Sequence, residues 1–310
     1  MQRNKPEAGR LRLIAAAFTA FDATGEVALD VIERQAGLLR QQDVDGVFVC
    51  GSTGEGPSLT VDERMAIARR WGEVGAGLEV IVQVGHVSLP EARRLATAAA
   101  ADGADGIAAM APFYYEPVPL EALIDFCGEV AAGAPELPFL YYHIPALTHV
   151  HPPMTAFIEM ARRRIPTFAG VKFTSPDLSE MGRAIEAAGD DLAILSGPDD
   201  LLLQAITVGA RGAVGSTYNL AARHYRAIFD AAQSGDLERA SRLQAQARRF
   251  IDISHQRGGL GAFKAMSGWL GVDCGPCRLP LRGIDEAAES ALRQAIEAEG
   301  LLDLLIAPEH

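Results

Sequence analysis

The chain has 310 residues, carries a net charge of −12 at pH 7, and is 49% hydrophobic but only 6% aromatic. Its length suits one barrel domain with a short extension, and its acidic balance, with no run of lysines or arginines, argues against nucleic acid as a partner. The first ten residues are polar and no segment holds the roughly 20 consecutive apolar residues of a membrane span, so we expect a cytoplasmic protein without a membrane partner.

Eight short apolar runs recur along the chain, with longer amphipathic stretches between them. The runs cover residues 11–18, 46–50, 78–84, 106–111, 138–142, 168–172, 192–196 and 212–215. Most are continuous rather than alternating, which is typical of parallel strands buried on both faces. Helix-like stretches include residues 30–42, 60–74, 88–101 and 175–188, and the last three begin at residues that commonly cap helices. Eight β-then-α units favour an α/β fold closed into a (β/α)8 TIM barrel over an open doubly wound sheet.

After the eighth run the pattern changes to helices alone. From residue 220 onward the helical stretches are broken at residues 234–235, 258–259 and 271–280. The first of these helices completes the barrel. The sequence therefore predicts a barrel over residues 1–235 and a C-terminal helical extension over residues 236–310 that packs on it.

Polar residues gather where the predicted strands end. They follow six of the eight runs, at residues 51–56, 112–115, 142–145, 172–174, 196–200 and 215–219. Catalytic groups of (β/α)8 barrels lie at the carboxyl ends of the strands, which meet on one face. That face therefore collects a lysine, tyrosines, hydroxyl groups and glycine-rich backbone.

Lys172 stands out because it ends the apolar run 168–172 with no acidic neighbour in sequence. In an apolar barrel mouth the ammonium form loses its hydration, and the neutral amine that results can attack a ketone to form a Schiff base. The competing interpretation is a strand-end lysine whose amine reaches solvent.

Two further features would serve such chemistry. Tyr142 ends the neighbouring strand, where its phenol can relay a proton, although a barrel tyrosine with a satisfied hydroxyl is the simpler interpretation. The turn at residues 51–56 can hold a carboxylate through Ser52, Thr53 and backbone N–H groups. It lacks the Gly-Lys-Ser/Thr ending of a nucleotide P-loop, and a plain strand–helix turn is an equal alternative.

Other candidate sites are weaker. Cys274 and Cys277 have redox-motif spacing but follow the barrel, and with no second cysteine pair we expect neither a zinc site nor a disulfide framework. His149 and His151 lie two residues apart in a predicted loop, and we interpret them as exposed loop histidines rather than metal ligands. No Gly-x-Gly-x-x-Gly motif follows the first run, which disfavours a dinucleotide cofactor.

Three of these features together resemble the dihydrodipicolinate synthase / N-acetylneuraminate lyase superfamily. They are the Gly-Ser-Thr-Gly-Glu turn at residues 51–55, Tyr142 and Lys172, and the resemblance runs from the first strand to residues 278–281. Residues 141–148, 170–173 and 215–219 are similar to the sialic acid lyase branch of that superfamily. Dihydrodipicolinate synthases typically carry an arginine soon after the tyrosine, where this chain has Ala-Leu-Thr at residues 146–148.

The resemblance implies a cofactor-free class I aldolase that acts on a small keto acid. Lys172 forms an imine with the C2 keto group, the C3–C4 bond breaks, and pyruvate and an aldehyde sugar are released. Tyr142 takes the proton of the C4 hydroxyl, helped by Ser52, and Ser52 and Thr53 hold the carboxylate. Tyr114 matches a tyrosine that family members lend across a dimer interface, within a homotetramer built as a dimer of dimers. The positions that match contacts to the sugar tail are Thr174, Gly197, Asp199, Asp200 and Ser216.

The chain departs from the family at the predicted substrate tail. The usual Asp-Glu pair after strand seven is Asp199-Asp200 here, and His149 stands where glycine is common. Alternatives to a sialic acid lyase are therefore another imine-forming aldolase or dehydratase of 2-keto-3-deoxy sugar acids, or an enzyme like dihydrodipicolinate synthase. A non-enzymatic alternative is a sugar-acid sensor, against which the intact Lys172 and Tyr142 argue.

Overall fold

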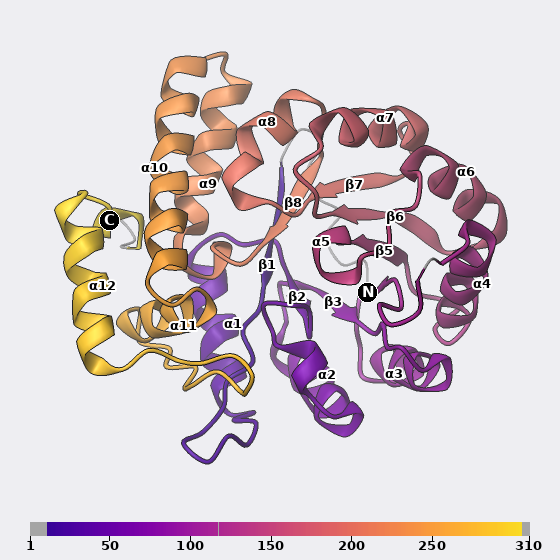
Figure 1. Cartoon of the computed structure of the whole chain (residues 1–310), viewed down its shortest axis with the longest axis horizontal. Coiled ribbons are helices and arrows are strands. Elements are labelled where there is room, and N and C mark those ends of the chain that lie inside the picture. Colours follow the sequence, from indigo (N-terminus) through magenta and orange to yellow (C-terminus); the bar gives the residue numbers. More distant parts are fainter. Residues whose placement is uncertain (1–10, 117, 306–310) are drawn as a thin grey trace.

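Eight parallel strands close into a barrel in the computed structural model, which describes residues 11–116 and 118–305. Each strand pairs with the next along the chain, and β8 pairs with β1 (Figure 1). The strands are β1 Arg12–Ala16, β2 Gly46–Val49, β3 Glu79–Gln83, β4 Gly106–Met110, β5 Phe139–His143, β6 Phe168–Phe173, β7 Ala193–Ser196 and β8 Gly212–Gly215. The predicted (β/α)8 barrel is thus confirmed. The polar residues 1–10, where we expected no signal segment, lie outside the described residues.

Helices follow the strands, and most of them cover the outside of the barrel. They are α1 Val31–Gln41, α2 Val61–Val74, α3 Leu89–Ala101, α4 Leu120–Ala131, α5 Pro145–Thr148, α6 Met154–Arg164, α7 Leu178–Ala188, α8 Leu202–Thr207 and α9 Tyr218–Gln233. Short 3₁₀ turns η1 Gly56–Ser58 and η2 Asp199–Leu201 follow β2 and β7. The Thr60–Glu63 capping box of α2 forms as predicted, whereas Ser88 precedes α3 without a side-chain capping bond. The helix predicted from residue 175 begins only at Leu178, since Asp177 is its capping residue.

Two apolar layers hold the barrel together. The barrel interior is filled mainly by one or two inward side chains from each strand, among them Ile14, Phe48, Leu140, Leu195 and Val214. A larger layer lies between the outward side chains of the strands and the covering helices. Because small and branched residues dominate both layers, backbones approach closely and the interior is packed rather than hollow.

The C-terminal helices form a further layer on one side of the barrel (Figure 1). They are α10 Leu237–Gln256, α11 Leu260–Trp269 and α12 Glu286–Ala298, followed by the 3₁₀ turn η3 Leu302–Leu304. Their apolar side chains pack with Phe18, Ala20 and Val31, which belong to the loop after β1 and to α1. Within residues 11–116 and 118–305, no helix is long and apolar enough to cross a membrane.

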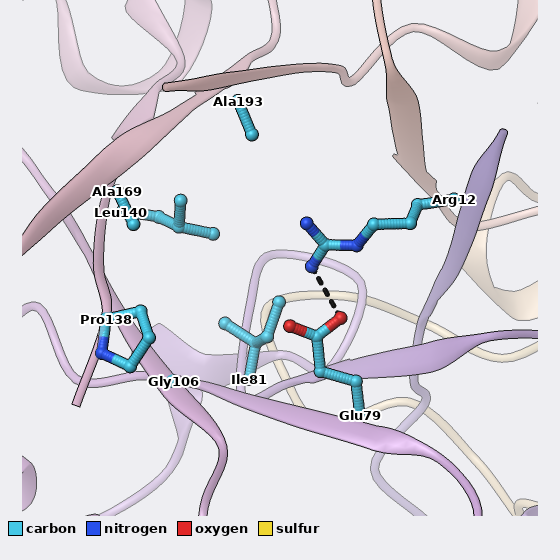
Figure 2. A pocket seen from close by; sticks show the side chains of 8 residues that line it. All are labelled: Arg12, Glu79, Ile81, Gly106, Pro138, Leu140, Ala169 and Ala193. Atoms are coloured by element: carbon cyan, nitrogen blue, oxygen red, sulfur yellow. Dashed lines mark hydrogen bonds and ion pairs between the residues drawn. The ribbon is translucent and has the colours of Figure 1, made fainter. Parts of the chain in front are cut away.

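A small cavity lies at the amino-terminal end of the barrel, opposite the face where polar residues gather. Arg12 donates to Glu79 at 2.5 Å beside it, and apolar atoms of Ile81, Leu140 and Ala193 face it (Figure 2). Its volume is about 200 Å³, whereas ligand pockets usually enclose about 300–1,000 Å³. This end of the barrel therefore serves stability, as is general for the fold.

Candidate active site

A one-residue irregularity in β6 turns Lys172 into the barrel. Phe139 pairs with Phe168, but the next residue, Leu140, pairs with Gly170, so β6 contains one extra residue at this point. Because side chains alternate between the two faces of a strand, one extra residue exchanges the faces of everything that follows. Lys172 consequently lies opposite the inward-facing Tyr142. Gly170 has a φ of +145°, and a Cβ there would lie 2.0 Å from the carbonyl oxygen of Ala193, so only glycine fits.

The Lys172 amine is enclosed by aromatic rings. The side chain is 4% exposed, and Nζ lies 4.1 Å from the ring centroid of Phe48 and 4.1 Å from that of Tyr142. Within the described part of the chain, no carboxylate forms an ion pair with it, and Nζ has no hydrogen-bond acceptor. A buried amine without a fixed partner is available to a carbonyl carbon.

Two pairs of hydroxyl groups lie on the same face of the barrel as this amine, at the ends of three strands. The Tyr142 hydroxyl lies 3.3 Å from Ser52 Oγ, which connects the end of β5 to the turn after β2. Thr53 Oγ1 lies 2.5 Å from Ser216 Oγ, which connects the same turn to the end of β8. The structure therefore brings together the predicted residues Lys172, Tyr142, Ser52, Thr53 and Ser216.

Asp199 is a buried carboxylate at the end of β7. One of its oxygens, Oδ2, accepts hydrogen bonds from the backbone N–H of Thr217 at 2.9 Å and from its hydroxyl at 2.6 Å. The other, Oδ1, is also buried, and the carboxylate interacts with the buried Tyr218 hydroxyl through its charge and a hydrogen bond. Burial raises the pKa of Asp199, against the opposing effects of the Thr217 hydrogen bonds and of the Lys172 charge. The Asp199 carboxylate is thus held by Thr217 on one side, and together with burial it raises the pKa of the Tyr218 hydroxyl.

Glycines make room for the remaining predicted residues. A Cβ at Gly215 would lie 1.6 Å from Asp199 Oδ1, and a Cβ at Gly197 would lie 2.0 Å from Thr174 Oγ1. The Thr174 hydroxyl is buried and has no partner within the described ranges. Asp200 is half-buried. These residues line the ends of β6, β7 and β8, next to the group around Lys172.

Helix α10 holds the strand-seven loop from outside the barrel. Gln244 donates to the carbonyl oxygen of Asp199 at 3.2 Å, and Arg248 donates to that of Asp200 at 2.7 Å. Both contacts are with main-chain atoms. They fix the position of the loop without engaging the side chains that face the site.

Tyr114 lies apart from the other predicted residues. It is 77% exposed on the loop after β4, where its ring packs against Tyr115 at 5.2 Å between centroids. Tyr114 therefore lies outside the group of residues around Lys172 in its own chain. His149 and His151 are exposed as expected, and all four cysteines are free thiols, with Cys50, Cys127 and Cys274 buried. Among the described residues, no His, Cys, Asp or Glu side chains cluster as a metal site would require.

The roles of two residues that form or support this site were not anticipated from the sequence. Phe48 forms one wall of the lysine enclosure, but in a continuous apolar run the inward positions cannot be distinguished. Glu55, the last residue of the Gly-Ser-Thr-Gly-Glu turn, points away from the site, and its side chain pairs with Lys264 at 3.2 Å. Because 209 residues separate the two in sequence, no local pattern identifies the pair.

His143 follows Tyr142 and faces outward, so it lies behind the site. Its ring lies near Tyr141 and Phe173, and neither ring nitrogen has a hydrogen-bond partner in the described part of the chain. Burial, and to a lesser extent the nearby His151, lowers the pKa of His143 to about 4. The carboxylate of Glu180 is 4.0 Å from Nε2, too distant to hold a proton there against burial.

We expect His143 to make the fold acid-sensitive. The unfolded chain binds a proton at this residue near pH 6.5, whereas the folded chain does so only near pH 4. The free energy of unfolding should therefore fall as the pH decreases from 6.5 to 4, by up to about 3 kcal/mol from this residue. Urea unfolding at a series of pH values should show a smaller fall for His143→Phe, while the exposed control His149→Gln follows the wild type. Parallel curves for wild type and His143→Phe would contradict the assignment.

The fold and this site together define a class, the (β/α)8-barrel enzymes with a buried lysine amine on the catalytic face of the barrel. Residues 10–299 match the Dihydrodipicolinate synthetase family. The chain belongs to this family.

Individual relatives agree with that assignment. The chain is 40% identical over 291 residues to N-acetylneuraminate lyase of Homo sapiens, covering 91% of each protein. Among solved structures, the N-acetylneuraminate lyase (sialic acid aldolase) of Aliivibrio salmonicida is similar with a TM-score of 0.91 and 32% identity, covering 97% of this chain and 99% of that one. The Proteus mirabilis N-acetylneuraminate lyase gives a TM-score of 0.90 and 31% identity, over 94% and 99% of the two chains.

Proposed function

We propose that the protein is a class I aldolase that cleaves N-acetylneuraminate to pyruvate and N-acetylmannosamine. The observation that carries the proposal is the Lys172 amine, buried in the barrel beside the Tyr142 phenol and without an ion-pair partner among the described residues. The relatives named N-acetylneuraminate lyase, at about 40% identity over nine-tenths of the chain, support the choice of substrate.

Lys172 supplies the covalent chemistry in this proposal. Its amine adds to the C2 carbonyl of the open-chain sugar acid, and loss of water gives the protonated imine. Tyr142 gives its proton to the hydroxyl that leaves the carbinolamine as water, and the resulting phenolate then removes the proton of the C4 hydroxyl. The C3–C4 bond breaks, and its electron pair passes to the imine nitrogen as an enamine is formed. N-Acetylmannosamine leaves as the aldehyde. Protonation of the enamine carbon and hydrolysis of the imine release pyruvate and restore the amine, so no cofactor or metal takes part.

The surrounding polar groups bind the substrate. Ser52 and Thr53 hold the carboxylate at the pyruvate end, and Ser52 also supports the Tyr142 hydroxyl, from which it lies 3.3 Å. The sugar tail is bound by Thr174, Gly197, Asp199, Asp200 and Ser216. The buried Thr174 hydroxyl, which has no partner among the described residues, supports this role, since a hydroxyl-rich tail would satisfy it.

A substrate panel distinguishes this function from its nearest rival. Asp200 has a shorter side chain than the glutamate that is usual there, which favours as second candidate an aldolase or dehydratase of shorter 2-keto-3-deoxy sugar acids. We expect pyruvate release, measured with a coupled lactate dehydrogenase assay, to be fastest with N-acetylneuraminate. Release only from a shorter keto-deoxy acid would overturn the lyase proposal.

Condensation of pyruvate with aspartate semialdehyde would instead indicate dihydrodipicolinate synthase, although Ala146, Leu147 and Thr148 offer no cation for a second carboxylate.

We also propose that the protein works as a cytoplasmic homotetramer, a dimer of dimers in which Tyr114 reaches the neighbouring subunit's site. The exposure of Tyr114 and Tyr115, 77% and 76%, supports a contact surface at this loop, because the two rings pack together into one exposed apolar patch. Sedimentation equilibrium should give the mass of four chains. A monomer with full activity would contradict both the assembly and the role of Tyr114.

A further inference from the structure

A buried ion pair joins the Gly-Ser-Thr-Gly-Glu turn to the C-terminal helices. The side chains of Glu55 and Lys264 are 0% and 1% exposed, and Oε1 of Glu55 lies 3.2 Å from Nζ of Lys264. Lys264 also donates to the carbonyl oxygens of Thr19 at 2.9 Å and Pro276 at 2.5 Å. The second oxygen of Glu55 accepts from the backbone N–H of Arg278 at 2.7 Å. Both charges therefore have several partners, all of them on segments that lead to or from the barrel mouth.

The network of hydrogen bonds around this ion pair also contacts the turn that carries Ser52 and Thr53. The N–H of Glu55 donates to the carbonyl oxygen of Ser52 at 3.1 Å, and the Thr19 hydroxyl donates to that of Gly54 at 2.6 Å. Lys264 thus holds residue 55 directly and residue 54 through Thr19. No other lysine or arginine among the described residues forms an ion pair with this turn.

The backbone conformation of the turn requires contacts such as these to support it. Cys50 and Glu55, which bracket it, have φ values of +58° and +54°, in the left-handed region that non-glycine residues avoid. Conformations of this kind persist where the surroundings fix them. A Cβ at Gly56 would lie 2.1 Å from the carbonyl oxygen of Cys50, so the turn is also tightly closed.

Burial of two opposite charges is a poor way to gain stability, because desolvation offsets their attraction and a pair of apolar residues would serve as well. A buried pair instead fixes one geometry, since any displacement leaves a charge without partners. We propose that Glu55 and Lys264 are positioning residues, which hold the turn at residues 51–56 so that Ser52 and Thr53 are ready for the substrate carboxylate. The inference rests on the proposed function and extends it to the C-terminal extension.

Trapping of pyruvate tests this role without requiring the full reaction. The full chain is incubated with increasing pyruvate and borohydride, and the pyruvate concentration that gives half-maximal adduct is measured for wild type and Glu55→Gln. We expect this concentration to rise about tenfold or more in Glu55→Gln, and KM for N-acetylneuraminate to rise more than kcat falls. Glu79→Gln is the matched control, because it breaks the ion pair with Arg12 at the opposite end of the barrel. It should leave the half-maximal concentration unchanged whatever its effect on stability.

A variant in which both charged residues are replaced by neutral ones distinguishes a role in positioning from a role in folding. If Glu55→Gln fails to fold, the double variant Glu55→Gln/Lys264→Met removes both charges at nearly constant volume and should still show the raised pyruvate concentration, because Met cannot donate to Thr19 and Pro276. Wild-type behaviour of a folded Glu55→Gln, or of the double variant, overturns the inference and leaves the lyase proposal standing. Absence of any adduct in the wild type overturns both.

Discussion

Replacing Lys172 by methionine should abolish cleavage, with a fall in kcat of at least about 10⁴-fold, or about 5 kcal/mol in the barrier. Without the amine no imine forms, and the electrons of the C3–C4 bond have no acceptor. Methionine keeps the apolar volume between Phe48 and Tyr142 and removes a desolvated amine, so circular dichroism should show an intact barrel. Turnover is measured as pyruvate released from N-acetylneuraminate.

Borohydride trapping locates the reactive amine independently of turnover. The chain has only three lysines, Lys5, Lys172 and Lys264. Lys264 is held by Glu55 and two carbonyl oxygens, so we expect the N-carboxyethyl group left by pyruvate on Lys172 alone. Peptide mass spectrometry identifies the site. Equal labelling of wild type and Lys172→Met would eliminate the imine mechanism.

Tyr142→Phe should separate imine formation from bond cleavage. The variant keeps the ring that packs edge-on against Phe48, 5.4 Å between centroids, and loses only the hydroxyl beside Ser52. We expect kcat to fall about 10³-fold, the typical contribution of a positioned proton-transfer group, while the pyruvate adduct still forms on Lys172. The free energy of unfolding should change by about 1 kcal/mol or less, since one hydrogen bond is lost.

The neighbouring tyrosine is the matched control for this variant. Tyr141 is equally buried but lies on the outer face of β5, where its ring packs against Phe157 at 4.2 Å. Tyr141→Phe should therefore leave turnover unchanged. An unchanged rate in Tyr142→Phe would remove that phenol from the proton transfer and leave Ser52 as the nearest hydroxyl.

The strands could be predicted because their signal is local. Each apolar run has the length of a strand, and the observed bounds differ from the predicted ones by no more than two residues at either end. The last four long helices were marked by breaks at glycines, and α10 and α11 begin just after residues 234–235 and 258–259. By contrast α4, α6 and α8 were not placed individually, since their capping positions, Pro119, Pro153 and Leu201, carry no side-chain capping group.

Of the site residues, only those that lie at the ends of strands could be predicted from the sequence. Position alone found Lys172, Tyr142 and the turn at residues 51–56, and the resemblance added residues of strands six to eight. The inward direction of Lys172 depends on an irregular strand pairing, and the Glu55–Lys264 pair depends on a contact across most of the chain. Both are products of tertiary structure, which a periodic pattern does not encode.

Because of the extra residue in β6, the presence of the lysine in the sequence does not by itself place its amine inside the barrel. A homologue could keep the lysine, the tyrosine and the barrel, yet lose one residue between Phe168 and Val171, and the amine would then point into the helical layer. Such a protein would keep the lysine and the tyrosine in sequence but would lack the nucleophile inside the barrel. Conversely, inserting one glycine before an outward-facing lysine should turn that amine into the interior of a catalytically inactive barrel and so provide a nucleophile there.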